Sequence, residues 1–152
     1  MEGRKRMTSR EYVENYEKLN MEIIDKTIET NRLIKRLKDA AENTTTKGDG
    51  ERVQSSGSVD KMANAIVAYT YLEEELKQFV AERTAQKNEI LETIRLLPMA
   101  EYDLLLKVYV RGFTLKELQV MKKCSYSNVT TLHGYALKSL QRILDERKQA
   151  DN

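Results

Sequence analysis

The stretch CSYSNVTTLHGYALKSL, residues 124–140, combines two different patterns. In its second half, apolar residues recur at steps of three and four, as on the buried face of a helix: Val129, Leu132, Ala136, Leu137 and Leu140. Its first half holds small hydrogen-bonding residues, which are poor helix formers but are common at helix N-termini. The stretch therefore predicts a helix that begins at Ser125 or Ser127 and carries its polar groups at its N-terminal end.

Two shorter helices are expected before this one. The segment MAEYDLLLKVYVRG, residues 99–112, has apolar residues at helical spacing, and Gly112 is placed for a left-handed C-terminal cap. The segment TLKE, residues 114–117, has the pattern of a capping box and predicts a short helix through about Met121. Residues 98–147 are therefore expected to form a helix, a turn, a short helix, a tight turn and a longer helix. This order of elements is typical of a helix-turn-helix, whose last helix lies in the major groove of DNA.

The polar residues around this helix start supply the candidate contacts to double-stranded DNA. A recognition helix reads base edges with hydrogen-bonding side chains near its N-terminus. We assign base reading to the positions expected to face outward, which are Tyr126, Ser127, Thr130 and Thr131. Phosphate contacts are assigned to Lys122, Lys123, Ser125, Asn128 and Lys138, with helix capping as an alternative for Ser125 and Asn128. Residues 98–152 hold nine Lys and Arg against six Asp and Glu, which gives DNA binding weak support.

Residues 8–97 predict two long helices in an antiparallel, coiled-coil-like hairpin. The segment TSRE, residues 8–11, reads as a capping box, so the first helix should begin at Thr8 or Ser9 and run to about Glu42. Its apolar seam is expected to be Tyr12, Tyr16, Leu19, Ile23, Leu33 and Leu37, with a lapse near Lys26 and Thr30. The second helix, capped by Ser58 or Asp60 and ended by Pro98, should bury Met62, Ile66, Tyr69, Leu72, Leu76, Phe79, Ile90, Ile94 and Leu97.

The segment between the two long helices, residues 43–57, is expected to be a loop because Thr, Gly and Ser dominate it without an apolar period. Two helices alone bury little apolar surface, so we expect the chain to self-associate as a homodimer, most simply through a four-helix bundle. The expected fold class is therefore all-α, with a helical hairpin for oligomerisation at 8–97 and a helix-turn-helix domain at 98–147.

Composition argues against several function classes. A single cysteine excludes an internal disulfide or a cysteine-cluster metal site and fits a reducing cytosol. His133, the only histidine, has no acid or cysteine beside it, so we expect it on the helix surface near DNA and not in a metal or catalytic site. We find no catalytic, cofactor-binding or metal-binding constellation. Because no run of 18 apolar residues and no signal peptide are found, we expect a cytoplasmic protein without a membrane partner.

Two segments carry a family resemblance. LPMAEYDLLLKVYVRGFTLKELQ, residues 97–119, and SYSNVTTLHGYALKSL, residues 125–140, resemble region 4 of bacterial sigma factors, the helix-turn-helix that reads the promoter −35 element. With GERVQSSGSVDKM, residues 50–62, the chain is similar to small sigma-region-4-like proteins of phages and prophages of Gram-positive bacteria. It also looks similar to late-gene transcription regulators of the ArpU and RinA type.

The resemblance implies a transcriptional role in the bacterial host cytosol, with base reading at Tyr126, Ser127, Thr130 and Thr131. The chain departs from the family pattern in the scaffold helix and the turn. Gln119, Lys122 and Lys123 stand where a small residue, an apolar residue and a glycine are usual.

Three functions remain open on the sequence alone, and none of them is enzymatic. The first is a phage-derived DNA-binding transcription regulator. The second is a phage assembly or packaging protein, such as a small terminase subunit, for which a ring of eight or more subunits would be the sign. The third is an adaptor that binds RNA polymerase through the sigma-like part without reading DNA.

Overall fold

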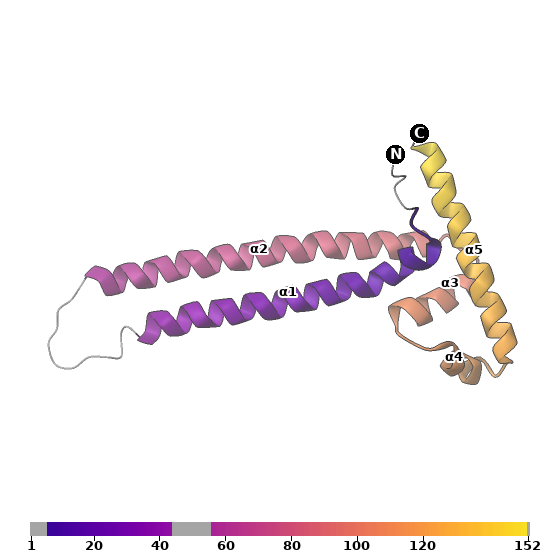
Figure 1. The fold of residues 1–152 in the computed structure, drawn as a ribbon, viewed down its shortest axis with the longest axis horizontal. Coiled ribbons are helices and arrows are strands. Elements are labelled where there is room, and N and C mark those ends of the chain that lie inside the picture. The colour runs from indigo at the N-terminus through magenta and orange to yellow at the C-terminus, as the bar shows by residue number, and fades with distance from the viewer. Residues whose placement is uncertain (1–5, 44–55, 152) are drawn as a thin grey trace. The chain divides into compact units, whose positions relative to one another are not determined.

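In the computed structural model, which describes residues 6–43 and 56–151, every regular element is helical (Figure 1). In chain order these elements are α1 (Ser9–Asn43), α2 (Ser56–Ile94), α3 (Met99–Leu105), the π-helical turn η1 (Leu106–Val110), α4 (Leu115–Lys122) and α5 (Tyr126–Ala150). The all-α class predicted from the sequence is confirmed for these residues. Of the expected loop 43–57, residues 44–55 lie outside the described part of the chain.

Most helix ends follow from local sequence. Thr8 and Glu11 form the predicted capping box: Glu11 N donates to Thr8 Oγ1 at 3.2 Å, and Thr8 N donates to Glu11 Oε2 at 3.1 Å. Gly112 has the predicted left-handed conformation, with φ +77°. The start of α2 was predicted too late, because the helix already begins at Ser56. Serine and glycine lower helix propensity but, unlike proline, do not block a helix.

The chain divides into two compact units, Met21–Arg83 and the combination of Met1–Asn20 with Thr84–Asn152. The division runs through α1 and α2 and does not coincide with Pro98. Each of the two long helices therefore contributes to both units, and the units are described separately below.

The unit Met21–Arg83 contains α1 from Met21 to its end and α2 from its start to Arg83, lying side by side (Figure 1). Arg83 Nε donates to Glu22 Oε2 at 2.8 Å, and Lys26 Nζ donates to Glu75 Oε1 at 3.1 Å. Residue numbers thus rise along one helix while they fall along the other, so the two segments are antiparallel.

The packed seam of this unit differs from the predicted one. Three residues assigned to the seam are exposed, namely Leu33, Met62 and Ile66. On α1 the buried positions are instead Thr30 and Ile34, which are 3% and 8% exposed. Lys26, where the apolar pattern lapses, is half-buried, and its ammonium lies 5.8 Å from the centre of the Phe79 ring. The aliphatic part of the Lys26 side chain fills this seam position while its ammonium group stays near solvent. The contact between the two helices therefore continues where the apolar pattern is interrupted.

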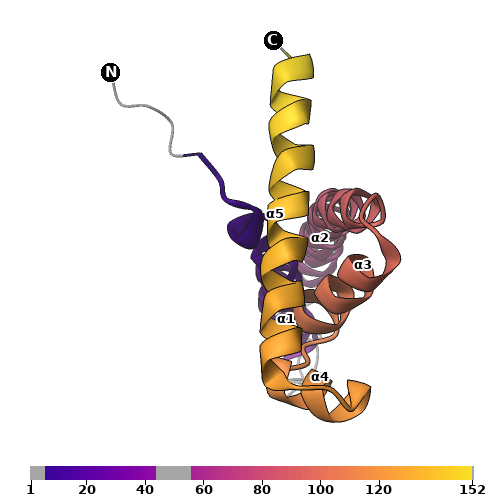
Figure 2. The same cartoon turned by 90° about the vertical axis from the view of Figure 1, so that its right-hand side faces the viewer.

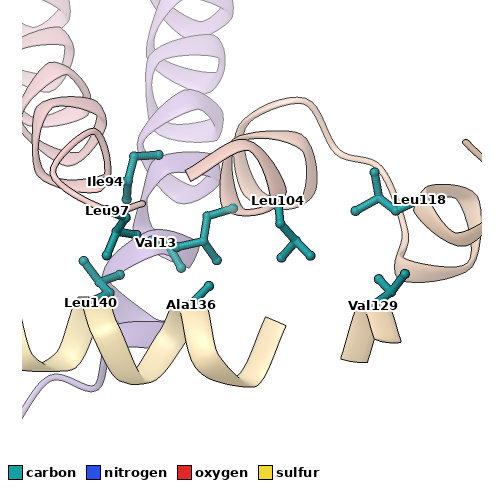
Figure 3. Packing of buried hydrophobic residues seen from close by; sticks show 9 residues of the cluster. Val13, Ile94, Leu97, Leu104, Leu118, Val129, Ala136 and Leu140 are labelled. Atoms are coloured by element: carbon teal, nitrogen blue, oxygen red, sulfur yellow. The ribbon is translucent and has the colours of Figure 1, made fainter. Parts of the chain in front are cut away.

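The other unit is built around α5, which packs against both α3 and α4 (Figure 2). The first turns of α1 and the last turns of α2 complete its core (Figure 3). The buried cluster consists of Val13, Ile94, Leu97, Leu104, Leu105, Leu118, Val129, Ala136 and Leu140. Next to it, the buried Thr93 hydroxyl lies 3.0 Å from Tyr12 Oη and accepts from Arg147 Nη1 at 2.7 Å, which links α1, α2 and α5.

A π-helical turn interrupts the helix that was predicted for residues 99–112. Arg111 N donates to Leu106 O at 3.0 Å, across five residues instead of four. Such a turn accommodates an extra residue and rotates the side chains that follow it. Tyr109 lies on this turn and reaches α5, where it meets His133.

Candidate nucleic-acid interface

Helices α4 and α5 are joined by a tight turn centred on Lys123. At the start of α4, Thr114 Oγ1 accepts from Glu117 N at 3.2 Å. At its end, Lys123 N donates to Val120 O and the next residue, Cys124, donates its N–H to Gln119 O, both at 3.3 Å. This pair of bonds is a Schellman motif, which needs a left-handed residue where Lys123 stands. Lys123 adopts that conformation, with φ 51° and ψ 43°.

The sequence left open whether Ser125 caps α5 or contacts phosphate, and in the structure Ser125 caps the helix. Its backbone is extended, with φ −75° and ψ 152°, and its Oγ accepts from Asn128 N at 3.1 Å. Of the two roles considered for Ser125, the side chain performs the capping role in this structure. Asn128 contributes its backbone N–H to the cap, and its side chain is exposed.

The outward face of α5 carries polar side chains in a regular order. Ser127, Thr131 and Lys138 are all exposed and follow one another at steps of four and seven residues, which places them on one side of the helix. At 1.5 Å per residue the row is about 16 Å long. The opposite side is formed by the buried Val129 and Ala136. Tyr126 is also exposed, at the first position of the helix.

Thr130 lies at the edge of this face. Its side chain is half-buried, and its hydroxyl donates to Ser127 O at 3.0 Å. The hydroxyl proton is therefore already used within the helix, while the oxygen retains the capacity to accept a hydrogen bond. Thr131, one residue later, is exposed.

The lysines assigned to phosphate differ in their surroundings. Lys123 and Lys138 are exposed. Lys122 is half-buried, and its ammonium lies 3.8 Å from the Asp103 carboxylate, which also accepts from Lys107 at 3.0 Å. The charge of Lys122 is thus partly balanced within the chain.

The outward face extends further along α5 than the sequence-based prediction placed it. Tyr135 is 58% exposed and Arg142 is exposed. Counting on from Thr131 by four, three and four residues reaches Tyr135, Lys138 and Arg142, so helical spacing alone contained this signal. The prediction missed both residues because it weighted the polar residues at the N-terminal end of the helix.

The expected surface position of His133 is wrong. The side chain is 8% exposed, and its Nε2 lies 2.7 Å from Tyr109 Oη, with the two rings stacked at 5.8 Å between centroids. Burial lowers the pKa of His133, and the nearby charge of Arg10 lowers this pKa further. The spacing Val129, His133, Ala136 places His133 on the buried stripe, where its position, and not its polarity, decides its burial.

Helix α4 exposes two apolar side chains beside the turn. Val120 is 76% exposed and Met121 is 51% exposed. They lie next to Lys123 in the sequence, and among the described residues no packing partner buries them.

Metal-binding and membrane-spanning features are both missing from the described part of the chain. No group of three or more His, Cys, Asp or Glu side chains is placed there to hold a metal ion. Among these helices, none is both long and apolar enough to cross a membrane. Comparisons of the chain with family models, with curated proteins and with solved structures find no match.

Proposed function

We propose that this chain is a DNA-binding transcription regulator of phage origin, in which α4 and α5 are the two helices of a helix-turn-helix. The observation that carries the proposal is the division of α5 into a buried face and an outward face. The outward face is polar at Ser127 and Thr131 and basic at Lys138 and Arg142. The transcriptional role comes from the resemblance to sigma region 4. In the same proposal, α1 and α2 form a coiled-coil-like hairpin that serves oligomerisation.

This order of side chains matches what DNA requires along a recognition helix. Short hydroxyl side chains near the N-terminus let the backbone approach the base edges, where each hydroxyl can donate or accept. Cationic side chains further along suit the phosphates at the rim of the groove. In this arrangement Ser127, Thr131 and Tyr126 face bases, whereas Lys123 and Lys138 face phosphates. Ser125 acts indirectly, by holding the helix start.

Genome-wide DNA capture with the purified full chain tests this function. We expect recovery of fragments that share a sequence, and tighter binding to such a fragment than to a scrambled one. Replacing Thr131 by alanine removes one hydroxyl that faces a base, so the preference for the shared sequence should fall by about 1–3 kcal/mol.

A second replacement separates phosphate contacts from base reading. Lys138→Ala should weaken binding to specific and scrambled DNA alike and lower the salt dependence by about one unit. Lys77→Ala removes an exposed lysine from α2 and serves as the matched control, with no change expected. Failure to recover any DNA at low salt would sink the proposal.

The exposed Val120 and Met121 favour a second candidate function, an adaptor that binds RNA polymerase through α4. Apolar side chains this exposed suit a protein surface better than a phosphate backbone. The adaptor function replaces the first one if the wild-type chain captures RNA polymerase but binds no detectable DNA, and if Val120→Asp abolishes that capture.

A further inference from the structure

Six side chains on the outer surface of α1 line one shallow depression of the unit Met21–Arg83. They are Asp25, Ile28, Glu29, Arg32, Leu33 and Arg36, hereafter the α1 stripe. All six are exposed, including the two apolar residues at its centre. They lie away from the seam that α1 makes with α2, which uses Thr30 and Ile34.

The charges of the α1 stripe are separated by sign. Asp25 and Glu29 stand four residues apart at one end, and Arg32 and Arg36 stand four residues apart at the other. None of the four forms an ion pair within the described residues, whereas the seam residues nearby do so. Within one helix the like charges four residues apart repel each other, and only Glu29 and Arg32 are spaced to attract, so the charges of the stripe are poorly compensated in a single copy. The separation by sign becomes favourable when opposite charges are supplied from outside.

The α1 stripe is complementary to itself when its direction is reversed. Asp25 and Arg36 are centred on the point between Thr30 and Asn31, and so are Glu29 and Arg32, and Ile28 and Leu33. The exposed Met21 and Ala40 continue the same relation outward. A two-fold axis through this point would therefore place every carboxylate opposite a guanidinium and every apolar residue opposite another.

We propose that two copies of this chain associate through the α1 stripe, with the α1 helices antiparallel about that axis. The interface is isologous, so each contact occurs twice. Asp25 and Arg36 each lie about 8 Å along the helix from the axis, within the contact length of helices that cross at about 20°. Guanidinium and carboxylate groups pair there in the two-pronged geometry that favours arginine over lysine.

The occupant of the α1 stripe is a second copy and not DNA. A nucleic acid would accept Arg32 and Arg36 but would be repelled by Asp25 and Glu29 in the same row. The inference does not depend on DNA binding, because it concerns the mass of the free protein.

Charge reversal at the two ends provides the test, read by sedimentation velocity of the full chain. Arg32→Glu with Arg36→Glu makes the stripe wholly acidic, and Asp25→Arg with Glu29→Arg makes it wholly basic. Each double variant alone should be monomeric at concentrations where the wild type is a dimer, with a dissociation constant raised about a hundredfold or more. An equimolar mixture of the two should form a heterodimer.

Two further variants distinguish pairing through the stripe from a general effect of altered charge. The fourfold exchange that combines both double replacements restores every opposite-charge pair and should be a dimer again. Glu73→Lys with Glu74→Lys makes a double charge reversal on α2 of the same unit and should leave the wild-type mass unchanged.

The inference is overturned if the wild type is a monomer at tens of micromolar or a ring of eight or more subunits. It is equally overturned if either charge-reversed variant remains a homodimer, or if the mixture or the fourfold exchange stays monomeric.

Discussion

Lys123 occupies a backbone position that ordinarily belongs to glycine. Its φ of 51° closes the turn between α4 and α5, and for an L-residue with a Cβ this conformation costs about 1–2 kcal/mol. We expect Lys123→Gly to stabilise the protein by about 1 kcal/mol in chemical denaturation, because the strain disappears while the turn remains. Lys122→Gly, one residue earlier at the last position of α4, is the control and should destabilise by up to about 1 kcal/mol. If both replacements act in the same direction, the turn is not closed by Lys123.

His133 makes stability depend on mild acid. Because burial, aided by Arg10, lowers its folded-state pKa below the ordinary value of 6.5, the unfolded chain binds a proton more readily. The contribution of neutral His133 is fully present above about pH 6.5 and is lost as the pH falls below it. Denaturation at about pH 7.5 and pH 5.5 should therefore give a lower free energy of unfolding at the acid value.

The control for this pH effect is His133→Gln, which keeps a hydrogen-bonding group near Tyr109 but does not titrate. No other histidine exists in the chain, so the variant should show a flatter profile over the same interval. Greater stability of the wild type at the lower pH would contradict the buried, neutral state of this imidazole.

At the scale of one element, α5 separates residues that build the helix from residues that face outward. Ser125 accepts a backbone hydrogen bond as its cap, whereas the Ser127 side chain is exposed. Ser125→Ala should therefore cost about 1 kcal/mol of stability. Ser127→Ala should change stability by less than about 0.5 kcal/mol while reducing sequence preference in DNA binding. Equal losses of stability in thermal denaturation would show that both serines are structural.

The elements differ in how well their sequence predicts them. The capping box at Thr8 was predicted correctly, because it acts through bonds to a residue three positions away, whereas the start of α2 was predicted too late. The α1 seam was placed on Leu33, whereas Ile34 is the buried residue. The prediction considered only apolar residues, and it therefore did not recognise that the half-buried Lys26 occupies a seam position. The π-helical turn was not predicted, because apolar spacing in residues 99–112 does not distinguish a bond across five residues from one across four. His133 was predicted to be exposed because its side chain is polar, although its spacing from Val129 and Ala136 already placed it on the buried face.

At the scale of the whole molecule, the proposed DNA binding and the proposed self-association use different parts of the chain. The α1 stripe lies in one compact unit, and the outward face of α5 lies in the other. Residues that would pair copies and residues that would read DNA are therefore separate, and each set can be changed without touching the other. Helical periodicity within one chain does not reveal the proposed pairing of two copies, because the exposed Ile28 and Leu33 resemble ordinary surface residues.

This separation gives a prediction about DNA affinity. In a dimer, binding of one helix-turn-helix raises the effective concentration of the second at a neighbouring half-site, which strengthens binding to a two-half-site fragment by a factor of about 10²–10⁴. The Arg32→Glu, Arg36→Glu variant should lose most of this factor on the full fragment. Its binding to a single half-site should equal that of the wild type, because no residue of α4 or α5 is altered. Fluorescence anisotropy with both fragments at one salt concentration measures the two affinities.

The fourfold charge exchange should restore binding to the full fragment. Equal affinity of the wild type and the acidic variant for the full fragment would mean that one copy suffices and that the α1 stripe plays no part in DNA binding.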